Sequence, residues 1–545
     1  MRVTNSARII AGTALLALGL AACGGESSTD GGTAAAGQPV RMELGEPQKL
    51  FYPGDTTESE GAEVLGAVFA PLVRYDENKQ VVNDVAESIK STDNKVWTIE
   101  LKPGYTWQDS AGTALTAQNY VDAWNYSANQ DNVQGANGFF SRIEGWADLN
   151  PGEGKTVSTK EMKGLKVVDD TTFKVTLTEP FSQFKTMLGY TAFYPLPKAA
   201  FGDDGKVTEA YAKQPIGQGY FKMDAPYNKG TSQTIDLTRY DKFPGEKPKF
   251  DKLQFKLYTS AETAFNDLRA GNLDIHDSLP PSAVASAKAE LGERYIDQAD
   301  AGVGYIGFPL QYNKIYSDIR IREAISMAID RKTIADTVFS GTRAPADDFI
   351  NPLLDGYRQG ACAVCTYDPA KAKAQYAEAG GPKTLELGYN SDGPHKEWIE
   401  AVANNLRANL DVQVSVKPFE KFASILDELD DKTYGGMFRM GWAIDYPSAE
   451  NYLTPVFSTI AIKTGSNYAG WSNKEFDGLL AKGDAAKTQK DGLQFYQQAD
   501  DLLIKEMPYV PVYFYRINAA FSQHVKGVKI NLLNQVEWTK VEKVA

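Results

Sequence analysis

The sequence predicts a mixed α/β fold built in more than one lobe. The 545-residue chain is long enough for two or three domains. Its composition, 42% hydrophobic with 11% aromatic residues, excludes disorder and indicates large buried cores. Segments with alternating apolar residues, typical of strands buried on one face, occur along the whole chain between segments with helical periodicity.

The N-terminus has the pattern of a bacterial secretion signal. Arg2 and Arg8 flank the start of an apolar run that ends at Leu20, and this run is shorter than the roughly 20 residues that cross a bilayer. The L-A-A-C sequence at 20–23 resembles a lipobox, in which Cys23 receives lipid such as palmitate; an ordinary secretion signal is the alternative. We expect a signal peptide at 1–22, then the lipidated cysteine and a flexible Gly-rich tether at 23–40.

The body of the chain alternates between expected strands and expected helices. Alternating apolar residues predict strands at 97–101, 173–177 and 253–257. Thr116 and Ser260 are expected to cap two helices, and Gly271 to end the second. Further helices are expected from the apolar stripe at 321–329, in a helical region that ends by Gly341, and after Asp392 and Pro394, where the apolar positions are Trp398, Val402, Leu406 and Leu410.

Charge and cysteine content limit the classes of partner. Without residues 1–22 the net charge is −15, which discourages binding to nucleic acid and to anionic membrane surfaces. Cys362 and Cys365 are the cysteines that remain beside Cys23, so disulfides do not build this fold. The C-x-x-C pair would need two more ligands to bind a metal, and no partner pair is visible. We therefore expect a small loop disulfide between Cys362 and Cys365.

Motifs that carry enzyme chemistry are missing from the sequence. It has three histidines, and none belongs to an H-E-x-x-H motif; no G-x-S-x-G elbow or Walker loop occurs. A G-x-G-x-x-G match at 302–307 is followed by Phe308 and Pro309 instead of a helix, so we expect a glycine-relaxed strand and no dinucleotide site. An acidic run at 427–431 is expected to be a solvated helix end. We expect no enzymatic activity, no metal and no cofactor.

The most specific local sequence is R-M-G-W-A-I-D-Y at 439–446. It resembles the R-x-G-W-x-x-D-Y segment of the oligopeptide-binding lipoproteins, which are family 5 solute-binding proteins of ABC importers. Further segments resemble the same family in the same order: G-E-P-Q at 45–48, V-F-A-P-L at 68–72, W-T-I-E-L at 97–101, P-I-G-Q-G-Y at 215–220, A-G-N-L-D at 270–274, I-R-E-A-I at 321–325, A-I-D-R at 328–331 and P-Y-V-P-V-Y at 508–513. Together they cover nearly all of the chain after the tether.

The resemblance implies a periplasmic-binding-protein-like trap of two lobes joined at a hinge. Lobe I would contain 41–301 and 518–545, with an inserted subdomain at about 69–189, and lobe II would be the continuous stretch 302–517. The protein would be lipid-anchored on the extracytoplasmic face of the bacterial cell membrane. As a monomer it would capture short peptides and deliver them to the permease and ATPase subunits. The alternative is the same fold and transport role with an oligosaccharide, an opine-like solute or a metal chelate as ligand.

The resemblance also implies the ligand-binding residues. The aspartate of its D-Y pair, here Asp445, would hold the ligand's α-ammonium group, because a charge-assisted bond orients a free amine. Gly441 and Trp442 would line the cleft, where the ligand adds to protein backbone like an extra strand. The remaining three matched positions are Arg439 and His395, at the ligand's carboxylate end, and Tyr515, near the backbone-binding groove.

From local sequence alone, these residues have simpler interpretations. Asp445 would be a turn residue before Pro447, and His395 an exposed residue in the first turn of a helix. Arg439 would be a surface or structural ion-pair partner. A second basic position used by some relatives falls at Asp430-Asp431-Lys432, and the stretch 138–140 has no clear counterpart, so the sequence does not predict ligand length.

Overall fold

The computed structural model describes residues 37–544, so the predicted signal peptide and Cys23 lie outside the described residues. Within 37–544, no helix has both the length and the apolar character that a membrane span requires.

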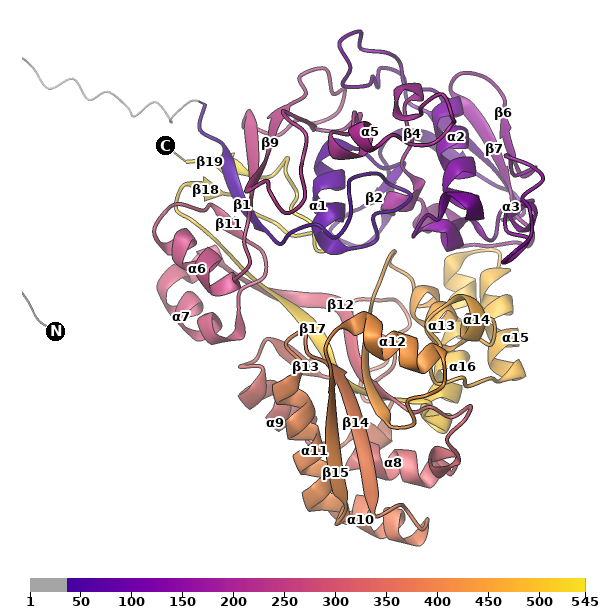
Figure 1. Ribbon diagram of the computed structural model, residues 1–545, viewed down its shortest axis with the longest axis vertical. Coiled ribbons are helices and arrows are strands. Elements are labelled where there is room, and N and C mark those ends of the chain that lie inside the picture. Colours follow the sequence, from indigo (N-terminus) through magenta and orange to yellow (C-terminus); the bar gives the residue numbers. More distant parts are fainter. Residues whose placement is uncertain (1–36, 545) are drawn as a thin grey trace, which may run out of the picture. The chain divides into compact units, whose positions relative to one another are not determined.

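One large sheet connects the upper and lower parts of the ribbon in Figure 1. It has eleven strands in the order β15-β14-β16-β12-β17-β11-β1-β10-β9-β8, with β13 attached to β17. Its strands are β1 (Val40–Leu44), β8 (Phe221–Met223), β9 (Thr234–Arg239), β10 (Lys252–Leu257), β11 (Ile275–His276), β12 (Tyr295–Gly307), β13 (Arg343–Pro345), β14 (Thr384–Asn390), β15 (Gln413–Phe419), β16 (Met437–Ala443) and β17 (Tyr509–Phe521).

Three smaller sheets lie beside it in the chain's N-terminal and C-terminal parts. A four-stranded sheet has the order β4-β5-β7-β6, and two further sheets each have two strands, β2-β3 and β18-β19. These strands are β2 (Val73–Tyr75), β3 (Val81–Asn83), β4 (Ala86–Lys90), β5 (Val96–Leu101), β6 (Leu165–Val167), β7 (Thr172–Thr176), β18 (Val525–Lys526) and β19 (Glu542–Lys543).

Helices cover the sheets in both parts of the structure. The α-helices are α1 (Ser59–Val68), α2 (Ala117–Ala128), α3 (Trp146–Leu149), α4 (Phe184–Met187), α5 (Glu209–Lys213), α6 (Ala261–Arg269), α7 (Pro281–Leu291), α8 (Ile319–Met327), α9 (Arg331–Thr333), α10 (Pro369–Glu378), α11 (Lys396–Leu410), α12 (Phe422–Asp430), α13 (Glu450–Phe457), α14 (Ala461–Thr464), α15 (Lys474–Asp484) and α16 (Gln489–Glu506). A π-helical turn, η7 (Ile334–Val338), follows α9, and short 3-10 turns include η2 (Asn137–Phe140) and η8 (Ala363–Cys365).

Most of the expected elements form where the sequence places them. The predicted strands at 97–101 and 253–257 are β5 and β10, and the one at 173–177 is β7, which ends one residue earlier. Thr116 caps α2: its backbone N–H donates to Asn119 Oδ1 at 2.9 Å. Ser260 caps α6 by accepting from the Thr263 N–H, and Gly271 follows the helix with a φ of +77°. The expected mixture of strands and helices is confirmed.

One helix start differs from the prediction. Asp392 and Pro394 do not begin the helix, which starts at Lys396 with His395 as its N-cap residue. The Asp392 carboxylate instead accepts hydrogen bonds from the Asn390 side chain and from the Phe422 N–H, at 2.6 and 2.9 Å. The Asp392 side chain therefore connects the loop after β14 to the start of α12. The local sequence suggested that Asp392 begins a helix, because it does not show that a distant backbone N–H binds this carboxylate.

Two large hydrophobic cores divide the described chain. The first contains residues from Val40 to Ile275 and from Val525 to Val541, and the second contains residues from Val303 to Phe514. We call the parts around these cores lobe I and lobe II. Tyr446, which comes from the lobe II segment, is the exception, because it packs into the lobe I core.

The strands β12 and β17 pair side by side and run from one lobe to the other (Figure 1). Their register is interrupted between Ala299 and Val303, where the three residues 300–302 of β12 lie opposite one residue of β17, Tyr515. The carbonyl of Ala301 in this bulge accepts a hydrogen bond from Tyr452 of lobe II. Bulges bend a strand and increase its twist. The predicted lobe boundaries, 301/302 and 517/518, fall in these two strands. The exact boundaries of the lobes and of the inserted subdomain at about 69–189 remain predictions.

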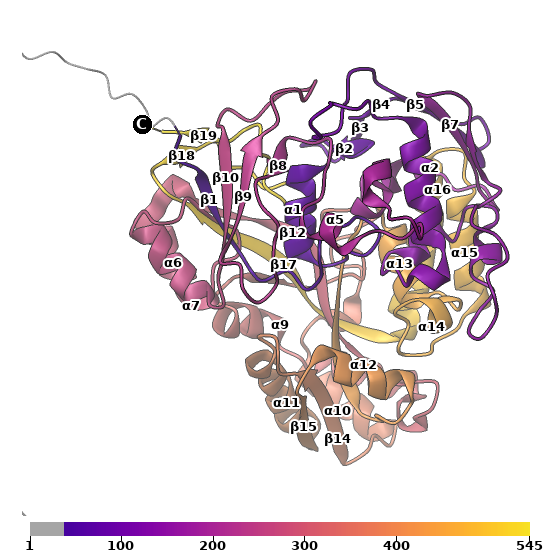
Figure 2. The ribbon, with the colours of Figure 1, turned by 45° about the horizontal axis from the view of Figure 1, so that its top comes forward.

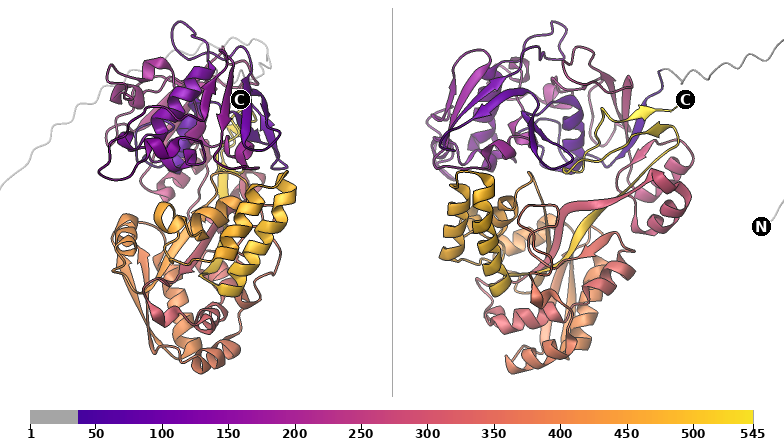
Figure 3. Two further views of the ribbon diagram at one scale, coloured as in Figure 1. Left: turned by 90° about the vertical axis from the view of Figure 1, so that its right-hand side faces the viewer. Right: turned by 180° about the vertical axis from the view of Figure 1, so that it is seen from behind.

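The lobes also touch at a second place, away from the crossing strands. Figures 2 and 3 show helices α13, α15 and α16 next to the segment that carries α2 and the four-stranded sheet. The Ser182 N–H of lobe I donates to the Asp484 carbonyl at 2.8 Å, and the Asn94 side chain donates to the Ala486 carbonyl at 2.9 Å. Hydrogen bonds therefore also connect the lobes at this second contact, in addition to the pairing of β12 with β17.

Candidate functional site

The carboxylate of Asp445 lies between the lobes, just after β16. Its own loop positions it, because the Asp445 N–H donates to Asn451 Oδ1 at 2.7 Å and the Asn451 amide donates back to Asp445 Oδ2 at 3.1 Å. Lobe I contributes Tyr190, which lies close enough to the same carboxylate to lower its pKa. The Tyr190 ring stacks on Phe139 with centroids 4.5 Å apart. Phe139 belongs to the stretch 138–140 that the sequence left unassigned.

No cation balances this carboxylate among the residues that the structure describes. Desolvation raises the pKa of Asp445 to about 6, and the neighbouring Glu450 charge adds to the shift, while the hydrogen bond from Asn451 and the neighbouring Tyr190 side chain oppose it. Asp445 keeps part of its surface accessible although protein surrounds it. A ligand can therefore reach the Asp445 carboxylate, although water solvates its charge poorly. The ammonium group of a ligand would supply the counter-charge that the carboxylate lacks.

The strand before Asp445 offers an open backbone edge. Residues 438–443 of β16 pair with β12 on one side, whereas β14 pairs with β16 only at Met437 and Phe438 within residues 37–544. Gly441 lies in this stretch, and a side chain there would meet the Val303 carbonyl at 3.1 Å and approach the Tyr515 hydroxyl. An unpaired strand edge can accept an extended chain as an additional strand.

The predicted residue Trp442 lies against a small apolar pocket of lobe II. The pocket is lined by Val303, Tyr305, Phe349, Trp442, Tyr452, Val456, Phe457, Tyr509 and Pro511. The indole Nε1–H of Trp442 is buried without a hydrogen-bond partner in the described structure. The Trp442 side chain thus lies beside the open edge of β16, and its indole N–H can still donate a hydrogen bond.

Two of the predicted residues form the opposite, basic end of the site. Arg439 is only 9% exposed, and one of its terminal nitrogens donates to Asn390 Oδ1 at 3.1 Å, while its Nε–H has no partner among the described residues. His395 is also buried, and its Nδ1 accepts from the Trp398 indole at 3.3 Å. Burial and the Arg439 charge lower the pKa of His395 to about 3. At neutral pH this histidine can therefore offer only a neutral Nε2–H donor, not the positive charge of a protonated ring.

A residue that the sequence did not single out, Arg343, lies at the same end. It pairs in register with Tyr515, and its guanidinium lies 4.4 Å from the centre of the Tyr515 ring. Its Nε–H also has no partner, and no carboxylate forms an ion pair with Arg343 or Arg439 within residues 37–544. Both arginines affect the pKa of His395, so the three side chains share one electrostatic environment.

The sequence also missed Tyr190 and Asn451, the two partners of Asp445. No local pattern marks Tyr190 or Arg343, because each reaches the site through contacts with distant strands or loops. Asn451 is different, because it follows Asp445 by only six residues and lies just inside α13. A polar residue at the start of a helix often bonds to the preceding loop, and this local pattern could have identified Asn451.

Other predicted features lie away from this site. Cys362 and Cys365 form a disulfide with the two Cα atoms 5.2 Å apart, at η8. The glycines at 302–307 lie in β12, as expected for a strand, and a Cβ at Gly304 would come within 2.2 Å of the Tyr513 ring. The acidic residues Asp427, Asp430 and Asp431 are exposed at the end of α12, as expected.

Comparison with protein families gives one match over most of the chain. The sequence profile of the bacterial extracellular solute-binding proteins, family 5 (middle), matches residues 80–463. The oligopeptide-binding protein OppA of Bacillus subtilis is 26% identical over 541 residues, which cover 94% of this chain and 95% of that protein. The periplasmic murein peptide-binding protein MppA of Escherichia coli is 25% identical, with 88% of each chain covered.

Solved structures have the same fold. The Escherichia coli murein tripeptide binding protein MppA matches with a TM-score of 0.78 and 24% identity, over 94% of this chain and 100% of that one. The Haemophilus influenzae OppA complex with the peptide RPPGFSPFR matches with a TM-score of 0.76 and 23% identity, over 93% of this chain and 99% of that one. These likenesses confirm the two-lobed architecture that the sequence predicts.

Proposed function

Because the chain belongs to the family 5 bacterial extracellular solute-binding proteins, we propose that it captures short peptides for an ABC importer. The single observation that carries this proposal is the Asp445 carboxylate, which lies between the lobes with no cation beside it in the described part of the chain and has its pKa raised to about 6. A peptide's α-ammonium group would supply the missing charge. A neutral sugar would leave the carboxylate unpaired, at a cost in free energy.

The remaining geometry supports a peptide bound in one direction. Its backbone would pair with the open edge of β16 next to Gly441 and Trp442, with its ammonium group at Asp445. Its carboxylate would lie near Arg439 and Arg343, whose charges have no carboxylate partner in the described chain. His395 would donate a neutral hydrogen bond there, and Tyr515 would hold Arg343 by stacking. These roles are part of the proposal.

The protein would act as a monomeric receptor and not as an enzyme. The relatives are named as binding proteins, for oligopeptides, murein peptides and dipeptides among others, and this naming supports the assignment. In this proposal Cys23 carries the lipid that holds the protein on the extracytoplasmic face of the cell membrane. The closed trap then delivers its peptide to the permease, and the ATPase subunits drive import.

The test of this proposal is a cycle of two changes measured by calorimetry, with tri-, tetra- and penta-alanine as probes. Asp445→Asn keeps the side-chain shape and removes the charge, and N-acetylation removes the charge of the peptide. Each change alone should cost on the order of 2–5 kcal/mol, or roughly 30- to several-thousand-fold in affinity. The two losses should not add, because both delete the same interaction.

The exposed residue Asp203 of lobe I provides a matched control, since Asp203→Asn removes one charge outside the segments that form the proposed contact and should leave affinity unchanged. Undiminished binding by Asp445→Asn, or tight binding of the acetylated peptides, would contradict the proposed orientation. If none of the oligoalanines binds while native mass spectrometry detects a co-purified solute without an amine, the ligand belongs to another class.

A further inference from the structure

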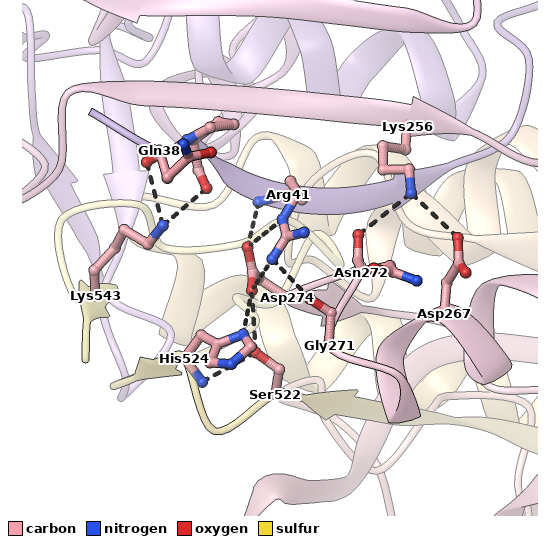
Figure 4. A network of polar contacts seen from close by, with 11 residues as sticks. Gln38, Arg41, Lys256, Asp267, Gly271, Asn272, Asp274, Ser522, His524 and Lys543 are labelled. Atoms are coloured by element: carbon pink, nitrogen blue, oxygen red, sulfur yellow. Dashed lines mark hydrogen bonds and ion pairs between the residues drawn. The ribbon is translucent and has the colours of Figure 1, made fainter. Parts of the chain in front are cut away.

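Two polar clusters lie next to each other on the parallel strands β1 and β11 of lobe I, which pair at Met42 and Ile275. The first surrounds the fully buried Asp274, shown in Figure 4. Arg41 binds both of its oxygens, through the backbone N–H and Nε to Oδ2 at 2.9 and 3.0 Å and through a terminal nitrogen to Oδ1 at 3.1 Å. Ser522 donates to Oδ1 at 3.1 Å. The charge of this buried carboxylate is therefore fully compensated.

The second cluster lies two residues further along the same strands and consists of Glu43, His276 and Asp277. One ligand atom from each residue lies within 4.8 Å of the other two. His276 is completely buried, and its Nε2 lies 3.1 Å from the Ala261 carbonyl. A carbonyl oxygen can only accept, so Nε2 carries the proton, and in the neutral ring Nδ1 presents its lone pair to the cluster.

That lone pair has no hydrogen-bond partner. Nδ1 lies 3.3 Å from Glu43 Oε2, but it is one of the buried polar atoms without a hydrogen bond in the described structure. Glu43 and Asp277 are each partly exposed, so the cluster can be reached from solvent. The Nδ1 of a completely buried imidazole thus lies next to the Glu43 carboxylate, with Asp277 in the same cluster.

Among the described residues, no positively charged side chain compensates this cluster. Lys256 stands opposite Glu43 in the strand register, but its ammonium group binds Asp267 Oδ2 at 3.1 Å and the Asn272 carbonyl at 3.3 Å (Figure 4). In residues 37–544 no lysine or arginine forms an ion pair with Glu43 or Asp277. The first cluster contains its own cation, whereas the second brings two carboxyl groups and the Nδ1 lone pair together.

We propose that Glu43, His276 and Asp277 bind one divalent transition-metal cation of the Zn²⁺ class. Metal–ligand bonds of about 2.1 Å place neighbouring ligand atoms roughly 3.0–3.4 Å apart, and the Nδ1–Oε2 distance of 3.3 Å lies in this range. The imidazole nitrogen favours zinc and similar ions over calcium and magnesium, which prefer oxygen ligands. The Ala261 carbonyl provides the outer hydrogen bond that orients metal-binding histidines.

The cation would have a structural effect that does not depend on the transport function. It joins β1, the first strand of the described chain, to the end of β11, and β11 pairs with the crossing strand β17. Because the unfolded chain would not hold these three ligands together, binding stabilises the folded state by mass action.

The test uses purified protein without a histidine tag, treated with EDTA and dialysed, and titrated with Zn²⁺, Mn²⁺, Ca²⁺ and Mg²⁺. We expect one Zn²⁺ per chain and a higher melting temperature with Zn²⁺, with much weaker effects of Ca²⁺ and Mg²⁺. Glu43→Gln and Asp277→Asn should each lower Zn²⁺ affinity by more than about tenfold and remove the thermal gain. In EDTA both variants should melt no lower than the unchanged protein, because each replaces one of two crowded carboxyl groups with a neutral amide of the same shape.

Two matched variants serve as controls, Glu87→Gln at an exposed glutamate of β4 and His524→Gln at a partly exposed histidine. Both should keep full Zn²⁺ affinity. A protein that takes up no Zn²⁺, or Zn²⁺ binding that Glu43→Gln and Asp277→Asn leave unchanged, overturns the proposal.

Discussion

Asp274 and Asp445 carry the same side chain, and their neighbours give them different chemistry. Asp274 is fully buried but binds Arg41 and Ser522, so its negative charge is compensated inside the protein. Asp445 has the neutral partners Asn451 and Tyr190 instead, and its pKa rises to about 6. The motif at 439–446 pointed to Asp445, but whether a cation lies beside it depends on residues far away in the chain.

The raised pKa of Asp445 predicts a pH dependence of peptide binding. Only the ionised carboxylate attracts an ammonium group, so a group with a pKa of about 6 in the free protein should weaken binding as the pH falls from 7 to 5, by roughly tenfold. The peptide's amine stays protonated in this range, and His395, with a pKa of about 3, stays neutral. Calorimetry with tri-alanine at pH 5, 6 and 7 measures the effect.

Asp445→Asn is the control for this pH series, because it leaves every other titrating group in place, including Asp484, whose pKa is also raised to about 6. In that variant the affinity should be nearly independent of pH between 5 and 7. The effect on the stability of the ligand-free protein has the opposite sign. A carboxyl whose pKa rises from 3.8 to about 6 on folding adds stability at low pH and loses this contribution as the pH rises through 6.

At the scale of single elements, the short strand β13 contributes more to the site than its length suggests. It pairs with β17 outside the main order of the sheet, and this pairing puts Arg343 over the ring of Tyr515. The second basic position expected from the family falls on the acidic end of α12 instead. Arg343 comes from a different element, so a comparison of positions along one segment could not identify it.

Arg343→Gln tests whether this strand provides a charge for the ligand's carboxylate. The variant should lose about tenfold or more in affinity for tetra-alanine, since a charge-assisted hydrogen bond is worth roughly 1.5–3 kcal/mol. It should lose little affinity for the same peptide with a C-terminal amide, because that peptide has no carboxylate charge. Calorimetry on the four combinations measures both losses.

An exposed arginine of α8, Arg320, forms ion pairs with Asp318 and Glu378 and provides the matched control, so Arg320→Gln should bind both peptides normally. Equal weakening of both peptides by Arg343→Gln would mean that Arg343 acts only by packing on Tyr515.

At the scale of the whole molecule, the lobes connect through the bulged pair β12–β17 and through a contact between distant segments. In that contact, Arg142 of lobe I lies 3.1 Å from Glu450 and 2.9 Å from Asp484 of lobe II. Both carboxylates are well shielded from solvent, so opening the lobes would leave them without their cation. Glu450 immediately follows the loop of Asp445, and this arrangement links the contact between the lobes to the ligand site.

We therefore expect ligand binding and lobe closure to depend on each other. The radius of gyration from X-ray scattering should decrease when the protein is saturated with peptide. Arg142→Gln removes the cation between the lobes, and it should expand the ligand-free protein and weaken peptide binding by roughly tenfold. Arg239→Gln, in lobe I at a pair of exposed acidic residues, should change neither quantity. Identical dimensions with and without saturating peptide would contradict closure.

The sequence by itself determined the local structure and the family of this protein. Alternating apolar residues marked β5, β7 and β10, capping residues marked α2 and α6, and the ordered motifs indicated a two-lobed solute-binding protein. These signals are local, because periodicity and capping depend on residues that are close in the chain.

Only the tertiary structure decided which charges are compensated. Arg41 reaches Asp274 across 233 residues, whereas Glu43, two residues further along the same strand, meets His276 and no arginine of the described chain. Periodicity shows which face of a strand is buried, but it does not show what lies opposite that face.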